Sequence, residues 1–424
     1  MRSAPNQPAT LTIVGKQSTT GPTSAQPKTN FAVAEAELAQ EAEPFRKRLN
    51  VWYVEHARDL PWRGVHNPYA TWLSEIMLQQ TRVATVIDRY QEFLHRFPSI
   101  EALAAADESQ VLALWSGLGY YRRARMLHRG AQFVARELDG KLPRNSNDLR
   151  TLPGVGAYTA AAIASIAFGE SVAVVDGNVE RVLFRILGLP EDKTAEGRAL
   201  INRAANSLVP PAAKRRGHGK NPPGDHNQAM MELGATICTP KSPLCLQCPV
   251  VDLCKTRGEH LTAPRGKQNS RTVAYLLALR KAGATTEVLL ERRPDAASLM
   301  AGMFELPPLP LEVTEDREPV LRVRHAITNT NYYALIFSEG APPAASPPGS
   351  EHRELSDDEA SIEDDMSVFT APQEGPLLLS EVSASERDLF WTPTRKLRGI
   401  PLTGLARKVL QRLGVMALPA VKIG

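Results

Sequence analysis

Hydrophobic side chains recur at helical spacing through most of the first 255 residues. In the segment VIDRYQEFLHRF, residues 86–97, apolar positions fall three or four residues apart, and NVERVLFRIL, residues 178–187, repeats the pattern. Such spacing gathers apolar side chains on one face of a helix. Because strand-like alternation is almost absent here, the pattern predicts an all-α region from about residue 36 to residue 255.

A different pattern begins after residue 270. RTVAYLLALRK and TEVLLERR, residues 271–281 and 286–293, predict paired strands, and NYYALIF, residues 331–337, predicts a third. PLTGLARKVLQRLG, residues 401–414, predicts an amphipathic helix that ends at its final glycine. The C-terminal portion is therefore expected to combine strands with helices.

Three segments show neither pattern. Residues 1–35 are rich in Ser, Thr, Pro, Gln and Ala and predict a disordered tail, because such a segment buries too little apolar surface to fold. Residues 256–270 are polar with Pro and Gly and predict a linker. A Pro/Ser-rich stretch that runs into acidic residues, about 341–367, predicts a disordered insertion.

Composition adds bounds but no function. With 424 residues and 43% hydrophobic content, the chain is long enough for two or three domains with cores of their own. A net charge of +4 is compatible with a polyanionic partner and decides nothing alone. The longest apolar stretches fall well short of the ~18 residues that span a bilayer. We therefore expect an intracellular protein that does not enter membranes; in a bacterium it would be cytoplasmic and associated with the nucleoid.

All four cysteines lie between residues 238 and 254, with the spacing C-x6-C-x2-C-x5-C. Two disulfides here would close very small loops and stabilise little else, so the spacing indicates a metal site. Four thiolates suit either tetrahedral zinc or a [4Fe-4S] cluster. Only one short C-x2-C pair is present, and Pro249 follows the third cysteine as in bacterial ferredoxin segments. The pattern favours an iron-sulfur cluster.

Two further features suggest contact with an anion and a charge at a helix start. LPGVG, residues 152–156, reads as a turn between two helices, and such a turn aims backbone N–H groups at one point, where a DNA phosphate would fit. An ordinary turn between packed helices is the alternative. Asp176, in AVVDGNVERVL, is placed to cap the helix that follows.

Taken together, these motifs resemble the helix-hairpin-helix DNA glycosylases that carry an iron-sulfur cluster, over about residues 44–255. Within that superfamily the chain is similar to the MutY-type adenine DNA glycosylases. The segments that carry this similarity are RDLPWR at 58–63, NPYATWLSEIMLQQTRV at 67–83, LWSGLGYYRRAR at 114–125 and NQAMMELGATIC at 227–238. The resemblance implies a DNA repair enzyme that excises adenine.

Residues of the catalytic step can be argued from their surroundings. Removal of adenine needs a proton donor for the departing base and a negative charge beside the cationic sugar. Glu75 lies among apolar neighbours, so we expect a raised pKa and the role of general acid at adenine N7. Asp176 at a helix start is expected to remain anionic and to stabilise the sugar cation. Both match catalytic positions of the family.

Tyr158 separates this chain from the relatives of endonuclease III, which carry a Lys at this place, two residues after the last hairpin Gly. A Lys amine forms a Schiff base with the sugar and supports strand cleavage, whereas a phenol does not. We therefore expect base removal with little lyase activity. Tyr158 is counted with Glu75 and Asp176 as a residue of the catalytic site.

Further site residues follow from the resemblance alone. It implies that the adenine pocket is lined by Arg58, Trp62, Leu78, Tyr158 and Gln228, and that Gln80 and Tyr120 insert into the base stack beside the oxidised guanine. It also implies contacts from the turn to DNA phosphate and ligation of the cluster. The residues concerned are Gly154, Val155 and Gly156 for phosphate, and Cys238, Cys245, Cys248 and Cys254 for the cluster.

The C-terminal unit resembles a Nudix fold that recognises 8-oxoguanine. The chain lacks the clustered carboxylates with which Nudix hydrolases bind magnesium, so no hydrolase activity of that kind is expected. Many relatives carry Phe-Ser-His in the loop that contacts the oxidised base, where this chain has Ile327-Thr328-Asn329. Thr328 and Asn329 keep hydrogen-bonding groups for that contact.

The complete expectation is a multi-domain protein: an all-α helix-hairpin-helix glycosylase core with a [4Fe-4S] loop, followed by an α+β Nudix-like domain. The boundaries expected for these parts are 36–66 with 177–255 for the iron-sulfur helical domain, 67–176 for a six-helix domain and 271–424 for the recognition domain. The expected partner is double-stranded DNA with adenine opposite 8-oxoguanine or guanine, bound by a monomer. The alternatives are a bifunctional endonuclease III-like glycosylase/lyase and a non-catalytic DNA-binding redox protein.

Overall fold

A computed structural model gives the fold. The residues it describes are 31–65, 67–212, 221–260, 268–327, 329–339, 382 and 387–417. The expected tail up to residue 30 and the expected insertion at about 341–367 lie outside the described residues. Among the described residues, no helix is both long and apolar enough to cross a membrane.

The first part of the chain is helical, as its periodicity predicts, and builds two separate hydrophobic cores. One core lies within a middle group of helices: α3 (Pro68–Leu78), α4 (Val83–Arg96), α5 (Ile100–Ala104), α6 (Glu108–Trp115), α7 (Arg122–Glu137), α8 (Ser146–Leu149) and α9 (Ala157–Phe168). The other lies within a group that joins both ends of this part: α1 (Phe31–Gln40), α2 (Ala42–His56), α10 (Gly177–Leu187), α11 (Ala195–Leu208) and α12 (Pro222–Thr236). The short helices η1 (Cys245–Gln247) and η2 (Val251–Leu253) follow in the cysteine loop.

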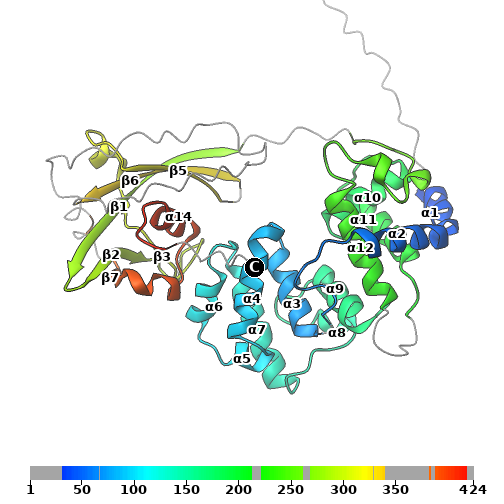
Figure 1. The fold of residues 1–424 in the computed structure, drawn as a ribbon, viewed down its shortest axis with the longest axis horizontal. Coiled ribbons are helices and arrows are strands. Elements are labelled where there is room, and N and C mark those ends of the chain that lie inside the picture. The colour runs from blue at the N-terminus through cyan, green and yellow to red at the C-terminus, as the bar shows by residue number, and fades with distance from the viewer. Residues whose placement is uncertain are drawn as a thin grey trace, which may run out of the picture.

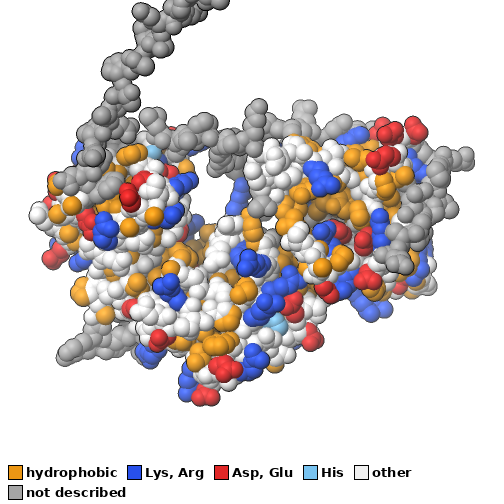
Figure 2. Space-filling model, turned by 180° about the vertical axis from the view of Figure 1, so that it is seen from behind, with side chains coloured by type: hydrophobic (Ala, Val, Ile, Leu, Met, Phe, Trp, Pro, Cys, Tyr) orange, Lys and Arg blue, Asp and Glu red, His pale blue; other side chains and the backbone are white. Residues whose placement is uncertain are grey.

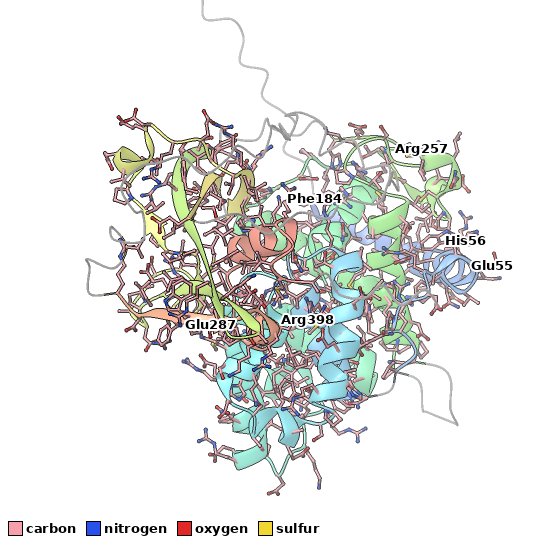
Figure 3. The ribbon with its side chains drawn as sticks, turned by 60° about the vertical axis from the view of Figure 1, so that its left-hand side comes forward. Glu55, His56, Phe184, Arg257, Glu287 and Arg398 are labelled. Atoms are coloured by element: carbon pink, nitrogen blue, oxygen red, sulfur yellow. The ribbon has the colours of Figure 1, made fainter. Side chains whose placement is uncertain are left out.

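The apolar periodicity translates into burial. In α10 five apolar residues at helical spacing are all buried, and Phe184 beside them is 1% exposed. The five are Val179, Val182, Leu183, Ile186 and Leu187. Figure 3 shows Phe184 inside this helical group, whereas Glu55 and His56 at the end of α2 point away from it. Helix α1 begins at Phe31, within the range expected to be a tail, because Ala34 and Leu38 pack into the second core.

The described residues of the C-terminal part form a mixed sheet of seven strands. These are β1 (Asn269–Ala282), β2 (Thr285–Arg292), β3 (Phe304–Glu305), β4 (Pro308–Leu309), β5 (Leu321–Ile327), β6 (Thr330–Glu339) and β7 (Leu389–Pro393). The central order is β3-β2-β1-β6-β5; β1 pairs with β2 antiparallel and with β6 in parallel. The helix α14 (Gly404–Arg412) and the short helices η3 (Leu311–Thr314) and η4 (Thr394–Gly399) complete this part.

The strand and helix predictions for this part are confirmed, with one difference in length. β1 begins at Asn269, inside the range expected to be a linker, because its first half pairs with β6 from Asn269↔Thr330 onward. The side chains of α14 close one face of the sheet, and the chain turns at Gly414, where φ is 66°.

The three groups lie in a row (Figure 1). The middle helices stand between the C-terminal sheet at one end and the group of α1, α2, α10, α11 and α12 at the other. Seen from behind, Lys and Arg side chains gather near the middle of the molecule (Figure 2). This arrangement leaves two places where sites can form: between the two helical groups, and between the middle helices and the sheet.

Candidate active site

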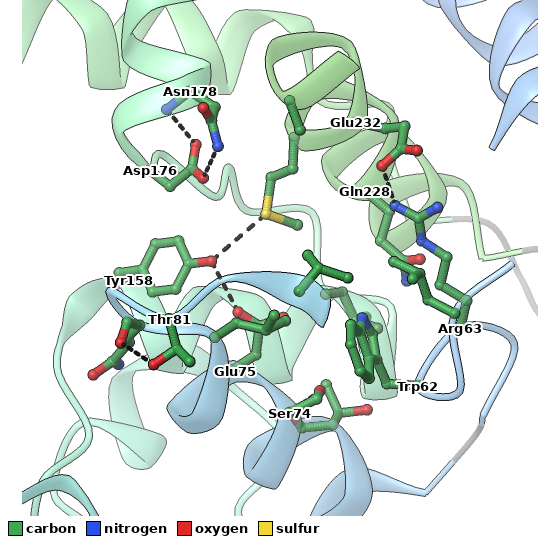
Figure 4. Close-up of a pocket in the computed structure, with 18 of the residues that line it drawn as sticks. Trp62, Arg63, Ser74, Glu75, Thr81, Tyr158, Asp176, Asn178, Gln228 and Glu232 are labelled. Atoms are coloured by element: carbon green, nitrogen blue, oxygen red, sulfur yellow. Dashed lines mark hydrogen bonds and ion pairs between the residues drawn. The ribbon is translucent and has the colours of Figure 1, made fainter. Parts of the chain in front are cut away.

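A cavity of about 650 Å³ lies between the two helical groups. Its walls come from α3 and the start of α9 on one side and from the start of α10 and from α12 on the other (Figure 4). Helix α3 begins at Pro68, where the side chain of Asn67 accepts hydrogen bonds from the N–H groups of Tyr69 and Ala70. That cap and nine consecutive buried residues hold α3 firmly in the middle core, so the side chain it presents to the cavity is rigidly placed.

Glu75 is the side chain that α3 places in the cavity, and it is 6% exposed. Burial disfavours its charged form and raises its pKa to about 7; a hydrogen bond from Tyr158 opposes this rise, and the charge of Asp176 adds to it. Tyr158 donates that bond from its hydroxyl to Glu75 Oε2 at 2.9 Å and also contacts Met231 Sδ at 3.6 Å. The environment expected for Glu75 is confirmed: near neutral pH, protonated and ionised forms coexist.

Asp176 caps α10, as its position in the sequence predicts. Its Oδ1 accepts from the backbone N–H groups of Asn178 at 2.9 Å and Val179 at 2.7 Å, and its Oδ2 accepts from Asn178 Nδ2 at 3.0 Å. Three hydrogen-bond donors and a helix N-terminus fix the orientation of this side chain and place positive partial charges beside it. One cavity therefore holds a carboxyl that is readily protonated and another whose surroundings suit a negative charge.

A third carboxylate in the same cavity was missed by the sequence analysis. Glu232 on α12 is 1% exposed and is held by two arginines, Arg58 at 2.8 Å and Arg63 at 2.6 Å. Burial alone would raise the pKa of Glu232, but the hydrogen bonds from Arg58 and Arg63 outweigh it and lower the pKa to about 2. Arg63 and Glu232 lie 169 residues apart, so spacing gives no sign of the pair. The only local signal is an acid within an otherwise small and apolar stretch of α12.

The other residues expected in the adenine pocket also line this cavity. Leu78, Trp62 and Gln228 contribute to its wall, with the Trp62 ring edge-on to Tyr90 at 5.5 Å and the Gln228 amide oxygen accepting from Tyr53 at 2.9 Å. The structure therefore brings together the side chains that the sequence separates by up to 170 residues.

A second cavity, of about 880 Å³, lies between the middle helices and the C-terminal sheet. Gln80 and Tyr120 line it from the helical side, and Ile327 lines it from β5. Thr328 lies outside the described residues, and Asn329 is exposed at the tip of the β5–β6 hairpin and does not line this cavity. The residues expected beside the base opposite adenine thus face each other in part.

The turn predicted at residues 152–156 joins α8 to α9. Gly154 has φ of 78°, and a Cβ there would lie 2.5 Å from Met126 Cβ, so both backbone and packing require glycine. Val155 is buried, and its N–H donates to Leu152 O within the turn. Gly156 is the N-cap of α9, and no side chain caps the helix. The first turn of α9 is therefore the part of this segment best suited to an anion.

The four cysteines line one small cavity, to which Arg185 of α10 and Ile237 at the end of α12 also contribute. Arg185 Nη1 lies 3.3 Å from Cys238 Sγ, and the N–H of Arg257 donates to Cys254 Sγ at 3.5 Å. Donors to sulfur suit thiolates that carry negative charge. No group of three or more His, Cys, Asp or Glu side chains in the described part of the chain meets at single-ion distances. Four sulfurs around one shared cavity provide the shell of four cysteine ligands that a [4Fe-4S] cluster takes.

Two known protein families match this chain, one over the helical part and one over the cysteine loop. Residues 73–211 match the HhH-GPD superfamily of base excision DNA repair proteins, and residues 238–254 match the iron-sulfur binding domain of endonuclease III. The first match covers the middle helices and runs through α10 and α11, and the second covers the cysteine loop.

Individual proteins extend the similarity. An adenine DNA glycosylase of Mus musculus is 38% identical over 388 residues, which cover 72% of this chain and 73% of the mouse protein. That of Homo sapiens is 48% identical over 230 residues, but this chain spans only 40% of it. That of Mycolicibacterium smegmatis is 44% identical, covering 47% of this chain and 65% of the relative. A solved thermostable thymine-DNA glycosylase is 29% identical and covers 51% of this chain and 97% of its own, with a TM-score of 0.46.

Proposed function

Because the chain belongs to the adenine DNA glycosylase family, we propose that it removes adenine paired with 8-oxoguanine or guanine by hydrolysing the N-glycosidic bond. It is a DNA glycosylase of base excision repair that carries a [4Fe-4S] cluster. The observation that carries the proposal is the pairing, in one cavity, of a buried Glu75 bonded to Tyr158 with an Asp176 held at a helix N-terminus. A flipped adenine enters this cavity.

Glu75 acts as the general acid. With a pKa of about 7, its carboxyl carries a proton in a substantial fraction of molecules at neutral pH. Tyr158 donates to Oε2 and thereby leaves Oε1 to hold the proton for adenine N7. The bond between the base and C1′ of the sugar then breaks, and its electron pair leaves with the protonated base. Asp176 stabilises the cationic sugar until water adds to C1′ and loses its proton to Glu75.

The ion pair at Glu232 orients the base. Arg58 and Arg63 hold this carboxylate in place at the far wall of the cavity, where Trp62 offers a flat face for stacking. Both carboxylate oxygens already accept hydrogen bonds from Arg58 and Arg63, so the ion pair orients the base through the guanidinium groups that it fixes, which donate to ring nitrogens of adenine. Leu78 and Gln228 complete the wall.

The reaction stops at base removal. Tyr158 occupies the place from which an amine would attack the sugar, and a phenol held against Glu75 forms no Schiff base. An endonuclease III-like glycosylase/lyase would need an amine here, and the residues that line the cavity in the described part of the chain include no lysine. We therefore assign the chain a monofunctional reaction.

The remaining parts bind DNA. The first turn of α9, after Gly156, receives a backbone phosphate.

Four cysteines ligate the cluster: Cys238, Cys245, Cys248 and Cys254. When bound, the cluster cross-links the loop and fixes its shape. Adenine release itself transfers no electrons. Residues 36–66 with 177–255 serve as the iron-sulfur domain, and 67–176 as the domain with the helical hairpin. The described residues of that second range form seven helices, α3 to α9, where the sequence predicted six. Residues 271–424 form a Nudix-like domain that contacts the opposite base through Thr328 and Asn329. We propose that the chain binds DNA as a monomer.

The proposal is tested by single-turnover assays on duplexes with one adenine opposite 8-oxoguanine or guanine. We expect abasic sites with both, faster opposite 8-oxoguanine, and strand breaks only after added alkali. Glu75→Gln keeps the shape and the hydrogen bond from Tyr158 but has no proton to donate, so we expect a loss of about 100-fold or more.

A matched control is Glu55→Gln, which removes an exposed carboxylate at the end of α2 and should leave the rate unchanged. Strand breaks without alkali, together with a covalent enzyme–DNA complex when borohydride is added, would favour the bifunctional alternative. Absence of adenine release by the cluster-loaded wild type would favour a DNA-binding redox protein.

A further inference from the structure

Two short turns of the middle helices, which carry the residues expected to insert into DNA, have strained backbones. Gln80, after α3, has φ of 56°, and Tyr120, before α7, has φ of 47°. Side chains other than glycine rarely adopt this region, and it costs about 1 kcal/mol or more unless neighbours impose it. Gln80 is exposed, and Tyr120 is 48% exposed, so neither is held by its own burial. Another group must impose both conformations.

Arg123, the second residue of α7, reaches the first of these turns. Its Nη1 donates to the carbonyl oxygens of Ile76 at 2.7 Å and Met77 at 3.1 Å, and also to that of Gln79. These carbonyls include the unpaired ones at the C-terminal end of α3, the helix that carries Glu75. The guanidinium therefore closes the end of that helix at the point where the Gln80 turn begins.

The other nitrogen of the same guanidinium reaches the second turn. Arg123 Nη2 donates to the carbonyl oxygens of Leu118 at 3.0 Å and Gly119 at 3.2 Å, directly before Tyr120. It also donates to Thr81 Oγ1 at 3.0 Å, and the Thr81 hydroxyl in turn lies 3.3 Å from Leu118 O. One side chain thus joins two turns that lie about forty residues apart in the sequence.

The chemistry of arginine suits this junction. A planar guanidinium presents its donors in a fixed fork, whereas a lysine ammonium is a compact charge without that geometry. The Arg123 guanidinium also lies over the rings of Trp115 and Tyr120, each with a centroid 5.5 Å away. Burial lowers the pKa of Arg123 to about 10, and the group still carries its charge at neutral pH.

We propose that Arg123 is a positioning residue that holds the Gln80 and Tyr120 turns together as one preformed wedge. The inference rests on the proposed function, since a wedge has a role only if adenine leaves the base stack. Inserting a rigid pair of side chains into the stack costs less conformational entropy than ordering two mobile turns on the DNA. Arg123 therefore acts on base extrusion and touches neither the bond that breaks nor the atoms that move protons.

The test compares two duplexes in single-turnover assays with the cluster-loaded, full-length chain. In one, adenine is paired with 8-oxoguanine; in the other, it faces an abasic-site analogue, so that it is already unpaired and needs little wedging. For Arg123→Lys we expect a loss of about 100-fold on paired adenine, the scale of a 1 Å misplacement, and little change on unpaired adenine. Fluorescence of 2-aminopurine beside the target adenine should report slower extrusion.

The matched control is Arg129→Met, which removes an exposed cation from the same helix and should not affect either duplex. Equal losses on both duplexes, or no loss on paired adenine, would overturn the inference. If Arg123→Lys does not fold, Thr81→Val removes one acceptor of the same network, and a smaller loss confined to paired adenine is expected. If the wild type releases no adenine from either duplex, the proposed function is refuted. The inference about Arg123 is tested separately, by comparing the rates of the variants with those of the wild type on the two duplexes.

Discussion

Three carboxylates share the active-site cavity, and their surroundings give them different properties. Glu75 is buried beside a single hydroxyl donor and has a pKa of about 7. Glu232 is as deeply buried but faces two guanidinium groups, and its pKa falls to about 2. Asp176 accepts three hydrogen bonds at the start of a helix. The roles proposed for them, acid for Glu75, orientation of the base for Glu232 and stabilisation of the sugar cation for Asp176, thus follow from their partners and not from residue type.

The raised pKa of Glu75 predicts a pH-dependent cost in stability. Unfolding returns its pKa to 4.5, so between pH 4.5 and about 7 the folded state binds a proton that the unfolded state lacks, and stability falls as pH rises. Since one pKa unit corresponds to about 1.4 kcal/mol, the cost above pH 7 is about 3 kcal/mol. Gln imitates the neutral carboxyl and escapes this cost.

Glu75→Gln should therefore be more stable than the wild type at pH 8 and equally stable at pH 4. The free energy of unfolding, measured by denaturant titration at both pH values, checks this, because other titrating groups cancel in the difference between the two proteins. If the difference in unfolding free energy between the two proteins does not change with pH, folding does not shift the pKa of Glu75.

At the scale of elements, the hairpin between α8 and α9 depends on a close approach to α7. Gly154 lies against Met126, and Gly130 of α7 in turn leaves room for the Trp72 ring, which a Cβ there would meet at 2.8 Å. The approach brings the first turn of α9, with Tyr158, up to α3 and Glu75. The same packing therefore shapes both the proposed phosphate site and the catalytic hydrogen bond.

Gly154→Ala should destabilise the protein by about 1–3 kcal/mol and weaken DNA binding, because the new Cβ meets both an unfavourable φ and Met126. Gly283→Ala is the matched control. It has a similar φ of 61° but nothing within 4 Å of its Cβ, so it should cost only about 1 kcal/mol. Chemical unfolding and DNA titrations at one salt concentration measure both. Equal costs for the two variants would show that the contact with Met126 contributes nothing.

At the scale of the whole molecule, buried contacts dock the sheet onto the middle helices. Arg407 of α14 donates to Ser116 Oγ at 2.7 Å, and the hydroxyls of Ser116 and Tyr121 both donate to Leu402 O at 3.0 Å. Met303, from the loop before β3, is fully buried in the core of the middle helices. This polar junction directly adjoins the Tyr120 turn, so the sheet can influence how that turn meets DNA.

Arg407→Met should loosen this docking and lower the preference for adenine opposite 8-oxoguanine over guanine by about tenfold, a common size for coupling between sites. The rate opposite guanine should persist, since the active-site cavity lies elsewhere. Single-turnover rates on both duplexes measure the ratio, with Arg395→Met, an exposed arginine of η4, as control. An unchanged ratio would show that the junction is structural alone.

The sequence by itself determined the local features of this protein. The spacing of apolar residues predicts the helices and the paired strands. The position of Asp176 before α10 predicts the helix cap, and the spacing of the cysteines predicts the cluster. Each of these features depends on residues that lie close together in the chain. Glu75 could be placed in an apolar setting from the residues around it.

Only the tertiary structure decided which distant groups meet. The contacts of Glu232 with Arg63, of Arg123 with Thr81 in the Gln80 turn and of Arg407 with Ser116 join residues between 42 and 291 positions apart, and no periodicity or spacing encodes such pairs. A charged side chain reads as solvent-exposed in a sequence unless its partner is known, since burial of a charge is tolerated only where the fold supplies that partner. Short-range sequence patterns therefore predict the helices and strands. The contacts of the proposed wedge, of Glu232 with its arginines and of the domain junction form only when distant parts of the chain pack together.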